Sequence, residues 1–436
     1  MPDFVYLMYC NMKDKSGNSI TLVERHKIGA GHVHFEEIDR LCFLSKNLYN
    51  AANYRIRQLF IDSGKEKLEG KREHALWLRY SDLQKQLQNE KQSDYTALPA
   101  KVSQQVLMLL DKNWKSFFTA IKVWSANKDK FTGQPALPKY KDKAHGRNVL
   151  TYTIQAISKT ALEKSIVSLS GTMIRIPTKQ KNIQQVRIVP ECGFYTIEIV
   201  YIKPKEVIRS LLKQNIAGID IGVDNLAAVT SNAEGVTPLL INGRALKSIN
   251  AYYNKKLARL KSLIGTGTSK RIRRMTEKRN SKIDHYLHCA SKYIVQHLVS
   301  NDIGTLVIGK NIGWKQQINL GDKNNQNFVQ IPHARFVGML QYKADMVGID
   351  VILVEESHTS KCSFIDNEPV QHQDKYLGKR VKRGLFVSKD GLLINADCNG
   401  SGNIIRKVFP NAFADGIQGV VVRPRRVSNL NPLSKS

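Results

Sequence analysis

Hydrophobic and polar positions change their spacing several times along the chain, and each change marks an expected element. Near the start, the runs FVYLMY and ITLVERHKI predict strands. From residue 36 to 127, apolar positions recur every three or four residues, which predicts long helices with one core-facing side. Trp114 and Phe118 belong either to that core or to a surface for stacking. The alternating segments MIRIP, QVRIV and FYTIEIVYIKP then predict a small barrel or sheet up to about residue 205.

The second half of the chain has the pattern of an α/β domain. NIAGIDIGVDNLAAVTSN predicts two strands joined by a turn, and TPLLINGR a third. A basic helical pair, broken at GTGTS, fills residues 250–300, and the strand TLVIGKN, a helix over HARFVGMLQYKADMVG and the strand DVILVEE follow. The order βββ-α-β-α-β is that of an RNase H-like domain, in which the fourth and fifth strands run parallel beside the first.

Charge indicates the class of partner. Lys and Arg total 67 against 37 Asp and Glu, a formal net charge of +30. An excess of this size is typical of proteins that bind nucleic acid. An anionic membrane surface is the alternative, but there is no long uncharged apolar run, so we expect no membrane partner. The start is too acidic for a signal peptide and the six cysteines are scattered, which favours a cytoplasmic, nucleoid-associated protein.

Two aspartates are candidates for metal chemistry. Asp220 lies within the apolar strand IAGIDIGV, where a carboxylate is costly to bury unless it is paired or bound to metal, although it could also cap a turn. Asp224, in the turn, is expected to be structural. Asp397, before the apolar stripe of INADCNGSGNIIRKV, is equally compatible with a metal ligand and with a helix N-cap.

Three basic segments are candidates for nucleic-acid contact. PALPKYKDKAHGR interleaves basic residues with an aromatic ring, KRIRRMTEKRN is basic on more than one helical face, and GKRVKRGLF is a short basic run. An ordinary charged loop and a solvated helix are the alternatives. The candidates are Lys139, Tyr140, Lys141, Lys270, Arg271, Arg273, Arg274, Lys278, Arg279, Lys379, Arg380, Lys382 and Arg383. The amides of Asn324, Asn325, Gln326 and Asn327 either touch substrate or order their loop.

Several blocks carry a family resemblance. GIDIGVDNLAAV, VIGKNIGWKQQINLGDKNNQNFVQIPHARFVGMLQYKADMVGI, EESHTSKCSFID, GKRVKRGLF and NADCNGSGNIIRKV resemble TnpB, the transposon-encoded RNA-guided nuclease related to type V CRISPR effectors. The resemblance also includes SKNLYNAANYRIRQ and GQPALPKYK. It implies a multidomain α/β protein with a wedge-like β-barrel (residues 1–35 and 129–206), a helical recognition lobe (36–128), a RuvC-like nuclease domain (207–357 and 395–436) and a small insert (358–394).

The resemblance also implies an activity. It predicts a Mg²⁺-dependent, RNA-guided DNA endonuclease with two metal ions, for which Mn²⁺ could substitute. The partners would be a guide RNA from the transposon end or an equivalent source and a double-stranded DNA target beside a transposon-adjacent motif. A guided DNA-binding repressor without cleavage is the alternative. A strand-joining transposase is permitted by the fold, but the blocks outside the nuclease domain disfavour it.

One catalytic position departs from the family. The family's first and third aspartates map onto Asp220 and Asp397, but its glutamate falls on Gly309. Glu355 and Glu356 end the neighbouring fifth strand, about 4.8 Å away. Successive residues face opposite sides, so we expect one of them to replace the missing acid. We prefer Glu355, which continues the strand; the alternative is that both are exposed charges. The predicted catalytic set is Asp220, Glu355, Glu356 and Asp397, with Asp220, Glu355 and Asp397 as metal ligands.

The insert departs as well. The family's zinc ribbon has paired CxxC motifs, and none occurs here. Cys362, His358 and His372 are three scattered candidates, whereas a structural zinc site needs four ligands. We therefore expect no zinc and a basic hairpin in its place.

Overall fold

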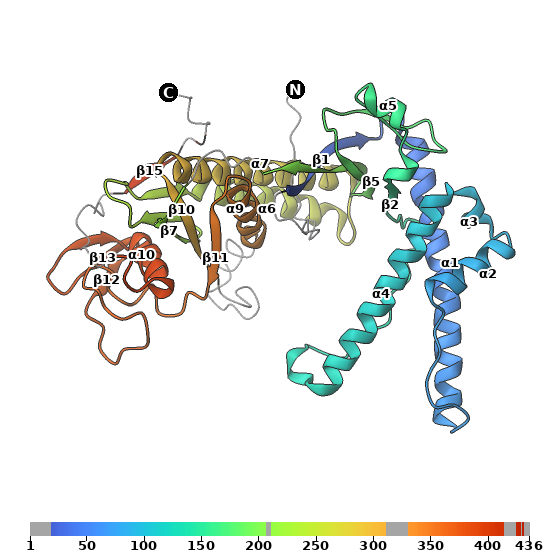
Figure 1. Cartoon of the computed structure of the whole chain (residues 1–436), viewed down its shortest axis with the longest axis horizontal. Helices are drawn as coiled ribbons and strands as arrows, with labels where there is room; N and C mark the ends of the chain where they lie inside the picture. The colour runs from blue at the N-terminus through green and yellow to red at the C-terminus, as the bar shows by residue number, and fades with distance from the viewer. Residues whose placement is uncertain (1–18, 206–210, 311–329, 414–423, 429, 431–436) are drawn as a thin grey trace. The chain divides into compact units, whose positions relative to one another are not determined.

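A computed structural model describes residues 19–205, 211–310, 330–413, 424–428 and 430 (Figure 1). The chain forms two compact units, Met1–Lys203 and Pro204–Ser436. The expected strand FVYLMY and the amides at 324–327 lie outside the described residues. Among the described residues, none of the helices combines the length and the apolar character that crossing a bilayer requires.

Two long helices dominate the first unit. They are α1 (Phe35–Leu68) and α4 (Ala100–Ala126), with α2 (Tyr80–Asn89) and α3 (Ser93–Ala97) beside them. Trp114 is fully buried, and its Nε1 donates a hydrogen bond to Asn53 Oδ1 at 3.0 Å. Phe118 packs against the rings of Phe60 and Trp77. Both aromatic residues therefore belong to the helical core rather than to a surface for stacking.

A four-stranded sheet completes the first unit. Its order is β1 (Ser19–Gly29), β6 (Phe194–Pro204), β5 (Ile183–Pro190) and β2 (Leu150–Thr153). A separate pair consists of β3 (Ile166–Ser168) and β4 (Arg175–Pro177), next to the short helix α5 (Lys159–Glu163). Closure of the sheet into the predicted barrel stays a prediction.

A six-stranded sheet forms the centre of the second unit. Its order is β11 (Asp350–Val354), β10 (Ile303–Gly309), β7 (Leu212–Asp220), β8 (Asn225–Ser231), β9 (Leu239–Asn242) and β15 (Arg425–Val427). β10 runs parallel to β7 and β11, and β7, β8 and β9 form the predicted antiparallel meander. The edge strand β15, parallel to β9, was not predicted from the sequence.

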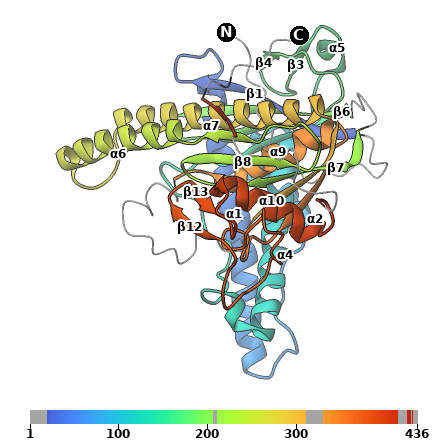
Figure 2. The ribbon, with the colours of Figure 1, turned by 90° about the vertical axis from the view of Figure 1, so that its left-hand side faces the viewer.

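Helices cover both faces of this sheet. α6 (Arg244–Ile264) and α7 (Lys270–Ser300) form the basic helical pair, and α9 (His333–Met346) packs against α7. Figure 2 shows α7 and α10 (Ala396–Val408) on opposite sides of β7 and β8. On the α10 side, Ile404 and Ile405 pack against Ile216 and Val307. This apolar contact holds the start of α10 close to the ends of the central strands.

The insert is organised by buried polar groups. The predicted basic hairpin is present as β12 (Lys379–Lys382) and β13 (Leu385–Val387), and β14 (Leu393–Asn395) adds a third strand. The Glu368 carboxylate, 2% exposed, accepts hydrogen bonds from the backbone N–H groups of Ser363 (2.6 Å) and Leu377 (2.9 Å). Asn399 and Asn403 of α10 bind the backbone carbonyl of Cys362. The insert is thus fastened to α10 by side-chain hydrogen bonds.

Candidate active site

Three carboxylates from three elements gather at one end of the six-stranded sheet. Asp220 is the last residue of β7, Glu356 follows the end of β11, and Asp397 lies in the first turn of α10. Burial raises the pKa of Asp220 well above its usual range, and the nearby charges of Glu356 and Asp397 raise it further. Asp220 is therefore buried close to two further carboxylates, which is the condition that a bound cation relieves.

Glu356, not Glu355, reaches this cluster. β11 ends at Val354, whose Cα is in register with that of Gly309. Glu356 is two residues further on, so side-chain alternation directs it to the same side as Val354, which packs against α10. Glu355 is exposed. The structure thus places Glu356, rather than the preferred Glu355, in this cluster, because β11 ends before Glu355 and Glu355 is exposed; the assignment of a metal ligand stays a prediction.

The space at Gly309 is filled by Glu356. A methyl group placed on Gly309 would lie 2.6 Å from both Cγ and Oε1 of Glu356, and 2.7 Å from Cδ1 of Ile404. The Glu356 side chain therefore occupies the volume that a side chain at position 309 would need. Burial raises the pKa of Glu356 to about 7. A carboxylate is thus present beside the end of β10, although it comes from β11.

A second glycine makes room for Asp220. A methyl group on Gly400 in α10 would lie 2.6 Å from Asp220 Oδ2. Any larger side chain at this position would collide with the carboxylate. The close approach of α10 to β7 depends on this glycine.

Asp397 is not the N-cap of α10. The N-cap of α10 is Asn395, whose side chain accepts hydrogen bonds from the backbone N–H groups of Asp397 and Cys398. This removes the helix-cap alternative for Asp397. Its Oδ2 accepts a hydrogen bond from Asn225 Nδ2 at 2.7 Å. Sequence reasoning missed Asn225, although its place in the GVDN turn directly after Asp220 was an available signal.

The basic hairpin of the insert borders the carboxylates. Arg380 lies 3.9 Å from Asp397 Oδ1, and Arg383 pairs with Asp224 at 2.5 Å. Asp224 also accepts a hydrogen bond from Lys247 at 2.6 Å, which gives it the structural role that was expected. Lys379 and Lys382 are exposed on the same strand as Arg380. The hairpin thus presents cations beside the cluster, where an anionic backbone approaching the carboxylates would meet them.

The other basic candidates divide into two groups. On α7, Lys270, Arg271, Arg273, Arg274 and Lys278 are exposed. Arg279 differs, because it is partly buried and donates hydrogen bonds to Asn250 Oδ1 (2.8 Å) and the backbone carbonyl of Gln330 (3.0 Å). Its position fits a structural crosslink better than nucleic-acid contact. In the first unit, Lys139, Tyr140 and Lys141 line a pocket that is described below.

The chemistry of the donor set fits a hard divalent cation. Mg²⁺ prefers carboxylate oxygens, and Asp220, Glu356 and Asp397 supply them from rigid elements. As placed, however, no group of three or more His, Cys, Asp or Glu side chains within the described ranges is arranged to hold a metal ion. The same holds for the zinc candidates: the rings of His358 and His372 are 5.8 Å apart, while Cys362 donates to the carbonyl of Gln371.

Two solved structures match most of this chain at low similarity. The cryo-EM structure of a Cas12f1–sgRNA–target DNA complex matches 88% of this chain and 98% of that chain, with a TM-score of 0.33 and 14% identity. The structure of the mini-RNA-guided endonuclease CRISPR-Cas_phi3 matches 91% and 93%, with a TM-score of 0.40 and 10% identity.

Comparisons of sequence give more specific information about the family than these structures do. A family model described as a probable transposase (OrfB_IS605) matches residues 199–315, and a model of the Cas12f1-like TNB domain matches residues 333–404. The TnpB-like protein ORF457 of Acidianus two-tailed virus is 23% identical over 85% of this chain and 83% of its own length. The two family models span the elements that carry Asp220, Glu356 and Asp397, and together with this relative they support a TnpB-type protein.

Proposed function

We propose that this protein is an RNA-guided DNA endonuclease that cleaves double-stranded DNA beside a transposon-adjacent motif. The observation that carries the proposal is the meeting of Asp220, Glu356 and Asp397 at one end of the sheet, with Glu356 in the space that Gly309 leaves. A protein that only binds nucleic acid has no use for three partly buried carboxylates gathered at one end of a sheet.

The surrounding structure supports a RuvC-like site. The strand order β11-β10-β7-β8-β9 is that expected of an RNase H-like nuclease domain. The net charge of +30 suits RNA and DNA as partners. We accordingly propose that residues 1–35 and 129–206 act as a wedge domain, residues 36–128 as the recognition lobe, and the remainder as nuclease domain and insert. Pairing between guide and target would supply sequence specificity.

Each residue of the site has a proposed role. Asp220, Glu356 and Asp397 would hold two Mg²⁺ ions, which when bound orient an attacking water and stabilise the leaving oxygen. Asn225 would orient Asp397 through the hydrogen bond to Oδ2. Lys379, Arg380, Lys382 and Arg383 would draw the phosphate backbone toward the carboxylates.

A guided DNA-binding protein without cleavage is the second candidate. It is favoured by Gly309, by the pairing of Arg380 with Asp397, and by the lack of a ready metal-holding group among the described side chains. Such a protein would act as a repressor, because it would occupy its target without cutting it.

A plasmid-cleavage assay separates the two candidates. The protein would be expressed with its native flanking DNA, a reprogrammed guide and a target with a randomised flank. We expect the wild type and Glu355→Ala to deplete particular flanks, and Asp220→Ala and Glu356→Ala to leave the library intact while guide RNA still co-purifies. Glu355→Ala is the matched control, since it removes an adjacent carboxylate that is exposed. An intact library with the wild type, with RNA bound, would leave the binding protein as the better candidate.

A further inference from the structure

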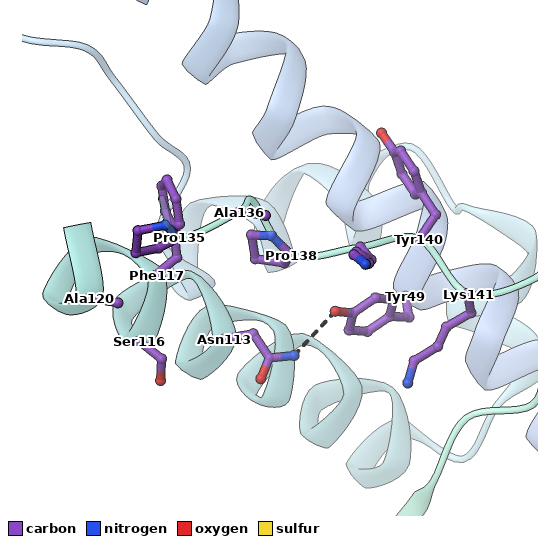
Figure 3. A pocket seen from close by; sticks show the side chains of 11 residues that line it. Tyr49, Asn113, Ser116, Phe117, Ala120, Pro135, Ala136, Pro138, Tyr140 and Lys141 are labelled. Carbon is purple, nitrogen blue, oxygen red and sulfur yellow. Dashed lines mark hydrogen bonds between the residues drawn. The ribbon is translucent and has the colours of Figure 1, made fainter. Parts of the chain in front are cut away.

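The first unit contains a pocket that the candidate active site does not use. It lies between α1, α4 and the extended segment at residues 135–141, and its volume is about 490 Å³ (Figure 3). Pockets of roughly 300–1,000 Å³ are typical of small-molecule and cofactor sites. The site is thus large enough for one nucleotide.

The walls of the pocket combine flat apolar surfaces with a few polar groups. Figure 3 shows Phe117 and Pro135 on one side, Pro138 above, and Tyr49 opposite. Asn113 Nδ2 donates a hydrogen bond to the Tyr49 hydroxyl at 3.2 Å, and this pair lies at the floor. The flat ring surfaces of Phe117 and Pro138 favour stacking of a base, while the Asn113 amide offers hydrogen bonds to its edge.

Charge at the rim is of one sign. Lys139 and Lys141 are exposed lining residues, and none of the lining residues is acidic. Lys141 Nζ lies over the Tyr49 ring, 5.5 Å from its centroid, so the cation is held at the pocket by this aromatic ring. A phosphate attached to a nucleotide in the pocket would therefore meet lysine ammonium groups.

Hydrogen bonds from α1 hold the wall segment of the pocket in place before any ligand binds. Asn53 and Arg57 of α1 donate hydrogen bonds to the carbonyl of Pro138, both at 2.9 Å. Asn50 exchanges two hydrogen bonds with the backbone of Lys141, at 2.9 and 2.8 Å. Residues 50, 53 and 57 lie on one helical face, so α1 holds the segment along its length. The Arg57 guanidinium also lies 4.7 Å from the Tyr140 ring centroid. Little ordering entropy is left to lose when a ligand enters.

We propose that this pocket captures a single unpaired nucleotide of the guide RNA, with its base against Phe117 and Pro138 and its phosphates on Lys139 and Lys141. The identity of the RNA as a guide rests on the proposed function; the pocket's preference for a nucleotide does not. Proteins read RNA mainly at unpaired bases, by stacking and by hydrogen bonds to base edges, which is the combination that these walls provide.

The matched variants are two serines of α4. Ser116 lines the pocket, and its hydroxyl donates to the carbonyl of Lys112 at 2.9 Å. Ser125 makes the same bond to the carbonyl of Ile121, also at 2.9 Å, but does not line the pocket. Both are exposed. Ser116→Trp fills the pocket, and Ser125→Trp makes the same change outside it.

The test is photo-crosslinking of the full-length protein. The probes are single-stranded octanucleotides of RNA that carry one 5-iodouridine, the same sequence in DNA, and an RNA whose neighbouring positions are abasic. We expect RNA crosslinks in the peptides covering residues 113–120 and 135–141. Ser116→Trp should reduce them about tenfold and Ser125→Trp should not, since stacking contributes strongly to single-strand binding. Circular dichroism of both variants checks that they fold.

Each outcome decides something. Crosslinks confined to other segments, or equal in Ser116→Trp and wild type, overturn the proposal. Stronger crosslinking to the DNA probe overturns the assignment to RNA. Guided plasmid cleavage is measured in parallel: pocket crosslinks without cleavage refute the proposed function but keep the nucleotide pocket. Cleavage without pocket crosslinks does the reverse.

Discussion

Gly309→Ala is the sharpest perturbation of the proposed site, because it adds one methyl group where Glu356 already lies. The new carbon would stand 2.6 Å from Glu356 Cγ and Oε1 and 2.7 Å from Ile404 Cδ1. Ordinary carbon contacts are about 3.5–4.0 Å, so Glu356 would have to move by roughly 1 Å. Overpacking of this kind costs about 1–3 kcal/mol of folding free energy. A shift of this size in a metal-binding carboxylate should also reduce cleavage strongly, on the order of 10²-fold.

The assay is a double-mutant cycle on thermal unfolding together with the plasmid-cleavage rate. In the Glu356→Ala background the two closest contacts of the methyl group are gone, so Gly309→Ala should destabilise less there, with a coupling of about 0.5–3 kcal/mol. Gly309→Glu combined with Glu356→Ala places a carboxylate back on β10 and should recover part of the cleavage that Glu356→Ala loses. If Gly309→Ala leaves both stability and cleavage unchanged, Glu356 does not fill this space and the relocated-carboxylate reasoning is refuted.

Three further predictions follow from other contacts. Asn225→Ala removes the 2.7 Å hydrogen bond to Asp397 and should lower the cleavage rate about 10- to 100-fold with little change in melting temperature; an unchanged rate would contradict a positioning role. Glu368→Ala leaves the buried Ser363 N–H without its acceptor, so limited proteolysis should cut residues 358–394 faster, consistent with a loss of about 1–3 kcal/mol of stabilising free energy. Glu368→Gln keeps an acceptor and should have a smaller effect. Equal proteolysis of the wild type and both variants would count against this hydrogen-bond network. Lys343 donates to Ser291 Oγ and the His288 carbonyl, and burial lowers its pKa to about 7. Because its unfolded pKa is about 10.4, the unfolded chain binds more protons between these values, and stability should rise with pH across that window. Calorimetry at pH 7 and pH 9 should show a smaller rise for Lys343→Met than for wild type, and parallel slopes would be evidence against this titration.

Much of the second unit was predictable because its elements are marked by local patterns. The apolar strands TLVIG and IAGID and the intervening basic helices have periodicities that do not depend on distant contacts. The connection rules for α/β sheets then leave few possible orders, and the observed parallel pairing of β10 with β7 and β11 is the predicted one. The edge strand β15 was not predicted, because a strand of only three residues has no hydrophobic pattern that distinguishes it from a loop.

The choice between Glu355 and Glu356 was beyond the sequence. Both are acidic residues at the end of one apolar run, and only the register of β11 against β10 decides which one faces α10. A shift of one residue reverses the side of every side chain on a strand. The same applies to Asp397, since the sequence allowed it to be a helix cap until Asn395 was seen to occupy that position.

Residue types and spacing predicted the order of strands and helices, a polyanionic class of partner and Asp220 as a candidate acid, whereas the family resemblance was needed to prefer Asp397 as a second acid over a helix cap. Tertiary structure alone decided that Glu356 fills the space beside Gly309, that Asn225 holds Asp397, and that α1, α4 and residues 135–141 enclose a pocket. The physical reason is range. Periodicity and charge are properties of neighbouring residues, whereas a site is made by side chains that are distant in the sequence and whose separations in space are set by packing.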